Sequence, residues 1–184
     1  INGVASLYVE VIRGIPLLVQ IFYIYYALGR IVRIPDLYSA VIAMAICYGA
    51  YMGEIFRAGI QSIPRGQTEA GKAIGLTGWQ RLIWVRLPTM FRIVLPSLSN
   101  AFVSLFKDTS LASIIGMMDL TKAAQTVSER EIRPFEMYLF IAVVYWIFAY
   151  SMSRFSRWLE VKMSPERAPS QGAALRRATE AAAA

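Results

Sequence analysis

The chain alternates long apolar runs with polar stretches, and the apolar runs set its organisation. Residues 135–152 hold one charged side chain, Glu136, in eighteen positions, and residues 37–53 hold none in seventeen. A helix that crosses a bilayer needs about 20 mainly apolar residues. Two such runs in 184 residues favour a membrane protein over a soluble helical protein. We expect spans at about 37–56 and 135–152.

Two further segments are predicted to cross the membrane. The run from Pro16 to Leu28 is apolar except for Gln20, and it reaches the required length only if one of its flanks extends it. Residues 89–106 carry a charge, a proline and several polar side chains, which a span tolerates when they face protein or a water-filled path. The expected fold is all-α, a multi-pass transmembrane helical bundle with four spans in this chain.

The remaining segments are shorter or more polar. Residues 1–13 have apolar positions at helical spacing and predict an amphipathic helix. The apolar piece 111–118, within the polar stretch 107–134, is too short to cross and indicates an interfacial or re-entrant segment. The Ser/Pro/Ala-rich residues 164–184 are typical of a disordered cytoplasmic tail. One membrane domain, residues 1–163, is therefore expected.

Composition supports a membrane protein and argues against several kinds of chemistry. Apolar residues make up 57% of the chain and its mean hydropathy is +0.47. With no histidine and one cysteine, a disulfide framework, most transition-metal sites and a Ser/His/Asp hydrolase are excluded. Cys47 lies in an apolar run and is interpreted as a packing residue. We expect no catalytic site and no metal site in this chain.

The distribution of basic residues predicts which polar segments lie in the cytoplasm. Four spans place residues 1–15, 54–92 and 153–184 on one side, with one, six and six Lys and Arg residues. The other side receives 29–36 and 107–134, with two and four. Cytoplasmic loops carry the excess of positive charge. The thirteen-to-six ratio places residues 54–92 in the cytoplasm.

The longest polar stretch begins at Pro64 and has strong local signals for two short helices. Residues 67–74 form the first predicted helix, and Gly75 follows it, where a left-handed conformation is suited to glycine. Thr77 is predicted to cap a second helix, with Gln80 three residues later completing a capping box.

Pro88 is expected to end regular structure before the next span, so that the two helices project into the cytoplasm. The first helix has a small, shallow apolar face, formed by Ala70, Ala73 and Ile74. Such a face is suited to lying in a groove of a partner.

The spacing within this stretch resembles the EAA loop of bacterial ABC-transporter permeases. The positions that correspond to the motif are Glu69, Ala70, Gly71, Gly75, Val85, Leu87 and Pro88, and two of them differ from it. Gly71 departs from the usual alanine, and Val85 from isoleucine. The resemblance implies a coupling helix that docks on an ATP-binding subunit, with Glu69, Ala70, Gly71, Gly75, Leu87 and Pro88 as the coupling residues.

Further stretches resemble the polar amino-acid permeases of the histidine/glutamine type. The first runs from Glu10 through Arg13, Gly14, Ile15 and Pro16 to Gln20, with Ile15 in place of the usual threonine. The others are Lys-Asp-Thr-Ser-Leu at 107–111 and Arg-Pro-Phe-Glu at 133–136. The resemblance covers about residues 5–162. It implies the type I ABC importer permease fold, which has five spans, and the first of these is expected to be absent from this chain.

The same resemblance implies the partners and the location. The chain would lie in the bacterial inner (cytoplasmic) membrane and bind a cytoplasmic ATP-binding subunit, an extracytoplasmic solute-binding protein and a second permease, identical or related. It would bind no cofactor itself, ATP and Mg²⁺ belonging to the partner ATPase, and no nucleic acid. No phosphate-binding Gly-rich loop with lysine occurs in the sequence, in agreement with an ATPase elsewhere.

Two polar residues near the first span, Arg13 and Gln20, have two alternative roles each. Arg13 is expected either to bind a lipid phosphate or an acidic neighbour, or to extend to the membrane surface as a flanking residue. Gln20 is costly in an apolar helix unless it is paired. It is expected to face the substrate path or to bond a neighbouring helix.

Four more residues are candidates for the translocation pathway. Ser97 and Asn100 share a face of the proline-containing helix because they are three residues apart. Lys107 and Asp108 are adjacent, so each needs its own partner. A structural salt bridge is the expected role, and the alternative is that one of them meets a zwitterionic substrate or the binding protein.

Other functions remain open at this point. A permease of the same architecture for another solute, such as an opine or an oligopeptide, has the same general pattern. A channel or an assembly scaffold that is not an ABC transporter would also present helices to a partner. A soluble amphipathic helical protein is the third alternative.

Overall fold

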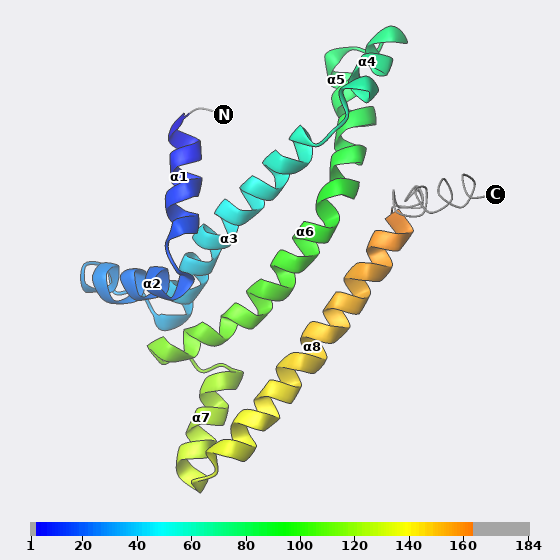
Figure 1. Ribbon diagram of the computed structural model, residues 1–184. Coiled ribbons are helices and arrows are strands. Elements are labelled where there is room, and N and C mark those ends of the chain that lie inside the picture. The colour runs from blue at the N-terminus through cyan, green and yellow to red at the C-terminus, as the bar shows by residue number, and fades with distance from the viewer. Residues whose placement is uncertain (1–2, 164–184) are drawn as a thin grey trace, which may run out of the picture.

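The computed structural model describes residues 3–163, and these residues are helical with short connections. The expected all-α class is confirmed. Figure 1 shows the long helices side by side, with short helices projecting at one end and a helical hairpin at the other. The helices are α1 (Gly3–Gly14), α2 (Leu17–Phe22), α3 (Asp36–Gln61), α4 (Arg65–Ala73), α5 (Gly78–Arg81), α6 (Leu87–Asp108), α7 (Leu120–Glu131) and α8 (Pro134–Met163).

Three helices of the described chain have the length and hydropathy to cross a membrane. They are α3, α8 and the continuous helical stretch Gly78–Ile115 that contains α6. The spans predicted at 37–56, 89–106 and 135–152 are confirmed, although each helix extends further. The predicted disordered tail, residues 164–184, lies outside the described residues.

The fourth expected span differs from the prediction. The segment Pro16–Leu28 belongs to a bent pair, because α1 and the helical stretch Leu17–Arg30 meet at 99°. The pair is a fourth span if it is one broken crossing, and otherwise it is a re-entrant loop. The described residues of the amphipathic segment, Gly3–Gly14, form α1, which is the first helix of this bent pair. The break has a local cause, because Pro16 lacks an N–H and lies in extended backbone (φ −56°, ψ 138°).

Pro88 does not end the helix before the third span, in contrast to the prediction. A π-helical turn, Leu82–Arg86, joins α5 directly to α6, and Pro88 lies at the start of α6. A proline ring clashes with the carbonyl four residues earlier in a regular α-helix. The wider π turn just before Pro88 removes that conflict, so α5 and α6 form one continuous element.

Two apolar clusters hold the helices together. In the first, Ile21 and Ile24 pack with Ala40, Ala43 and Met44 of α3 and with the 3₁₀ turn Thr109–Ile115.

The second cluster joins the other end of α3 to α6 through Ile63, Met90 and Val94. Gly59 lies in this contact, where an added Cβ would be 2.1 Å from Val94 Cγ1. Gly59 thus allows α3 and α6 to approach closely, as small residues do where membrane helices pack.

Candidate functional site

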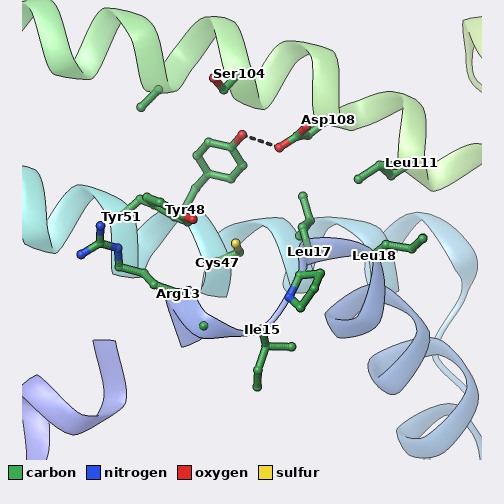
Figure 2. A pocket seen from close by; sticks show the side chains of 13 residues that line it. Arg13, Ile15, Leu17, Leu18, Cys47, Tyr48, Tyr51, Ser104, Asp108 and Leu111 are labelled. Carbon is green, nitrogen blue, oxygen red and sulfur yellow. Dashed lines mark hydrogen bonds between the residues drawn. The ribbon is translucent and has the colours of Figure 1, made fainter. Parts of the chain in front are cut away.

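A cavity lined by apolar, aromatic and charged side chains lies where the bent pair α1–α2 meets α3 and α6, and we call it the bend cavity (Figure 2). Its volume is about 580 Å³. Its lining residues are Arg13, Gly14, Ile15, Pro16, Leu17, Leu18, Cys47, Tyr48, Tyr51, Ala101, Ser104, Asp108 and Leu111. The motif at Arg13–Pro16 and the Lys-Asp-Thr-Ser-Leu motif, remote in sequence, therefore meet at one cavity.

Asp108 forms one side of the bend cavity. The Tyr48 hydroxyl donates a hydrogen bond to Asp108 Oδ2 at 2.7 Å, which joins α3 to α6 (Figure 2). The second carboxylate oxygen has no side-chain hydrogen bond among those found within residues 3–163. Ser104, one turn earlier on α6, lines the cavity on the same side. A carboxylate with an open oxygen is suited to a ligand ammonium group.

Arg13 forms another side of the cavity. Its Nη1 lies 4.0 Å from Glu54 Oε1, and its Cζ lies 5.1 Å from the centre of the Tyr51 ring. Glu54 is also bonded by Arg57, whose Nε donates to Oε2 at 2.7 Å. The acidic neighbour expected for Arg13 is therefore present. Because Glu54 is shared with Arg57, the guanidinium group of Arg13 keeps capacity for a further anion.

Arg13 also lines two smaller cavities next to the bend cavity. One, of about 420 Å³, contains Glu10, Glu54 and Arg57, and the other, of about 270 Å³, contains Ser97. The pathway prediction for Ser97 is compatible with this position. Arg13 is the residue common to all three cavities.

Gln20 lies at the bend and is buried. Its Nε2 donates to the carbonyl oxygens of Ile12 and Ile15, both at 2.9 Å. These carbonyls lose helical partners where Pro16 breaks the chain. Of the two roles expected for Gln20, the structure shows the bond to a neighbouring helix. The residue does not line the bend cavity, and its place in a substrate path stays a prediction.

The remaining pathway candidates are spread out. Asn100 and Lys107 are exposed and do not line the described cavities. A salt bridge for Lys107 or Asp108 is wrong for the described residues, because neither takes part in an ion pair between positions 3 and 163. Asp108 has a phenol as its partner instead.

Sequence reasoning missed Tyr48, Tyr51 and Glu54. These side chains are three residues apart along α3 and so lie on one helix face. A polar or semi-polar stripe within an otherwise apolar run was the available signal. The partners of these residues on α1 and α6 could not be predicted from the sequence, because the contacts join residues that are remote in the chain.

The second candidate site is the projecting pair of helices at the end of α3, which we call the coupling loop, residues 64–88 (Figure 1). Gly75 has φ +79° as predicted, and its N–H donates to the Lys72 carbonyl at 3.0 Å. The Leu76 N–H donates to the Gly71 carbonyl, also at 3.0 Å. These two bonds end α4 in a Schellman motif. The capping box of Thr77 and Gln80 is confirmed.

Gly71 has a packing role within the coupling loop. It is buried, and an added Cβ would lie 3.2 Å from Arg81 Cγ and 3.6 Å from Leu76 Cδ1. Glycine at this position lets α4 fold closely onto α5, so its small size serves the interior of the loop. Glu69 and Ala70 lie on the exposed side.

The exposed side of the coupling loop also carries large apolar groups. Ile74 is 77% exposed, Trp79 70% and Trp84 74%. Ile74 was expected on the docking face, whereas the two tryptophans were not predicted. Aromatic side chains of this size are enriched in interfaces.

Replacing Gly75 with alanine is expected to loosen the coupling loop. A non-glycine residue at φ +79° costs about 1–2 kcal/mol, and hydrogen exchange of the α4 and α5 amides should accelerate accordingly. Gly66→Ala is the matched control, because Gly66 is helical and nothing lies within 4 Å of its added Cβ. Equal exchange rates in the two variants would contradict the role given to the Schellman turn.

Comparisons with known proteins agree with these features. A family model described as "Binding-protein-dependent transport system inner membrane component" matches residues 1–165. The chain is 44% identical over 165 residues to the L-cystine transport system permease protein TcyB of Bacillus subtilis (strain 168), covering 89% of this chain and 70% of that protein. It is 39% identical over 165 residues to the glutamine permease GlnP of Escherichia coli (strain K12), covering 88% and 75%.

A similar fold occurs in solved structures. One, described as an amino acid ABC transporter with histidines, has a TM-score of 0.81 and 39% identity, covering 86% of this chain and 75% of that one. The MetNI methionine ABC transporter has a TM-score of 0.65 at 17% identity, covering 83% and 72%, and shows similarity of fold alone.

Proposed function

The chain belongs to the family of binding-protein-dependent transport system inner membrane components, and from this membership we propose that it is the permease subunit of an ATP-driven importer of polar amino acids. The observation that carries the proposal is the family match over residues 1–165 together with relatives named for cystine and glutamine transport. The bend cavity supports this substrate class by its charges.

A zwitterionic amino acid complements the bend cavity. Arg13 supplies a guanidinium group, which suits a carboxylate, and Asp108 supplies a carboxylate for an ammonium group. Figure 2 shows these two side chains on different sides of the cavity. Between them lie Tyr48, Tyr51 and apolar residues of the bend. The charges bind the part common to all amino acids, and the remaining lining contacts the variable side chain.

The coupling loop is the proposed contact with a cytoplasmic ATP-binding subunit. The resemblance to the EAA loop, the exposed Glu69 and Ala70, and the exposed Ile74 and Trp79 support this assignment. ATP binding, with Mg²⁺, would draw two such loops together, which requires a second permease, identical or related. This chain would hydrolyse nothing itself.

Movement of the coupling loop reaches the bend cavity through α6, which contains Asp108 and is continuous with α5. We infer that loop closure tilts this helix against α3 and opens the bend cavity to the other side of the bacterial inner membrane. There an extracytoplasmic binding protein would release its amino acid.

Glu69→Lys tests this function. In the complete transporter, reversing the charge at the exposed loop should lower amino-acid uptake and transport-coupled ATP hydrolysis by roughly tenfold or more, which corresponds to about 1.4 kcal/mol at the contact. Permease abundance in the membrane should not change, because Glu69 is exposed. Glu160→Lys, on α8, is the control for a charge reversal outside the loop. Unaltered uptake in Glu69→Lys would refute the coupling assignment.

A further inference from the structure

Arg13, at the edge of the bend cavity, has few partners of its own. Within residues 3–163 its guanidinium group forms no hydrogen bond, and its neighbours are Glu54, with Nη1 4.0 Å from Oε1, and the Tyr51 ring, whose centre lies 5.1 Å from Cζ. The Arg13 side chain is 40% exposed. A guanidinium group carries several N–H donors in a fixed fork, so Arg13 keeps donors available for an anion in the cavity.

Arg57, by contrast, is fully engaged on α3. Its Nε donates to Glu54 Oε2 at 2.7 Å, its Nη2 donates to Glu54 Oε1, and its Nη1 donates to Gln61 Oε1 at 2.9 Å. A guanidinium fork on both oxygens of one carboxylate is the strong form of this ion pair. Because Glu54 and Arg57 are three residues apart, the pair forms within one helix and does not depend on the position of α1.

Glu54 is therefore the carboxylate for which the two arginines compete. It is the one acidic residue within 4.0 Å of Arg13 among residues 3–163, whereas Glu10, one turn earlier on α1, lines a neighbouring cavity with them and forms no ion pair there. The Glu54 side chain is 27% exposed, and a partly buried carboxylate without a partner is costly. Without Arg57, a shift of about 1 Å would bring Glu54 and Arg13 to the roughly 2.8 Å of a charge-assisted bond.

We propose that Arg57 and Glu54 are positioning residues for the bend cavity. Neither of them lines it, and both act through Arg13, which Figure 2 shows beside Tyr51 at the cavity. Because Arg57 holds Glu54 in an ion pair within α3, the guanidinium group of Arg13 stays available to the carboxylate of an amino-acid substrate. The inference rests on the proposed function, which supplies that carboxylate.

Arg57→Met tests the competition. Methionine keeps much of the length of the arginine side chain and removes its charge and its donors, so Glu54 should capture Arg13. Equilibrium binding of radiolabelled L-glutamine and L-cystine to the purified complete transporter, without binding protein, measures the effect. We expect the dissociation constant to rise about fivefold, which corresponds to about 1 kcal/mol, the upper range for an exposed ion pair. In a structure of the variant, Arg13 Nη1 and Glu54 Oε1 should lie about 2.8 Å apart.

Glu54→Gln in the Arg57→Met background separates positioning from folding. Glutamine carries no charge with which to capture Arg13, so the double variant should recover wild-type affinity. A purely structural role for the network predicts the opposite, because the second loss would add to the first. Gln61→Ala is the matched control. It removes the 2.9 Å hydrogen bond to Arg57 and leaves the Glu54 pair in place, so the dissociation constant should not change.

Two results would overturn the inference: an Arg57→Met variant that binds as tightly as the wild type, or a double variant that binds no better than Arg57→Met. A wild-type transporter that imports no amino acid would instead refute the proposed function. In that case the distance between Arg13 and Glu54 in the Arg57→Met structure decides alone. A shortened distance supports the positioning role, and a distance unchanged from 4.0 Å overturns it.

Discussion

Gly59→Ala is expected to destabilise the permease by about 1–3 kcal/mol, the usual cost of overpacking a tight contact. The added methyl group would lie 2.1 Å from Val94 Cγ1, so α3 and α6 must separate or Val94 must change rotamer. Val94 is 1% exposed and, being β-branched, has few alternative rotamers. The melting temperature and the yield of monodisperse protein in detergent measure the effect.

Two further variants make this prediction specific. Gly49→Ala, on the same helix, should be neutral, because nothing lies within 4 Å of the added Cβ. Val94→Ala in the Gly59→Ala background should recover part of the stability, since it removes the clashing methyl group. If Gly59→Ala is as stable as Gly49→Ala, the close approach of α3 and α6 is not a feature of the folded protein.

Asp108→Asn is expected to lower amino-acid uptake by the reconstituted importer by roughly 10- to 100-fold. The physical reason is loss of a charge-assisted contact to the substrate ammonium group, about 1.5–3 kcal/mol for a hydrogen bond to a charged group. Uptake into proteoliposomes at fixed ATP measures it. Assembly with the ATPase should be retained, because Asp108 is the last residue of α6, whereas the coupling loop adjoins the first residues of that helix.

Tyr48→Phe shows whether Asp108 serves the substrate or the fold. The variant removes the 2.7 Å hydrogen bond between α3 and α6 and leaves the carboxylate in place. A substrate role predicts a smaller loss for Tyr48→Phe than for Asp108→Asn. Equal losses, with no further loss in the double variant, would assign Asp108 to holding Tyr48 and would contradict its substrate role.

The coupling loop was predictable from the sequence because its structure is local. Position 75 has a left-handed backbone conformation, which favours glycine. Thr77 and Gln80, three residues apart, form a capping box. These signals act within one turn of helix and do not depend on the rest of the fold. The lengths of the apolar runs likewise predicted the long helices, because the hydrophobic thickness of the bilayer sets how many apolar residues a crossing helix needs.

The bend cavity was predictable only in its parts. The motifs pointed to Arg13 and Asp108, but the partner of Asp108 is Tyr48, sixty residues away. Gly59 and Val94 are likewise brought together by the packing of two helices. Local propensity also gave the wrong result at Pro88, because a π turn before the proline was not readable from composition. Such contacts are decided by tertiary structure, which an isolated sequence without an alignment does not contain.

The continuous helix from Gly78 to Ile115 also has a mechanical consequence. Its 38 residues correspond to about 57 Å at 1.5 Å per residue. Acting as a lever pivoted near its middle, it would move each end by about 2.5 Å for a tilt of roughly 5°. Asp108, about 17 Å from the middle of the helix, would move by about 1.5 Å. That is enough to lengthen the 2.7 Å hydrogen bond between Tyr48 and Asp108 beyond its useful range. A small displacement of the coupling loop by the ATPase would thus break the Tyr48–Asp108 hydrogen bond on the opposite side of the membrane.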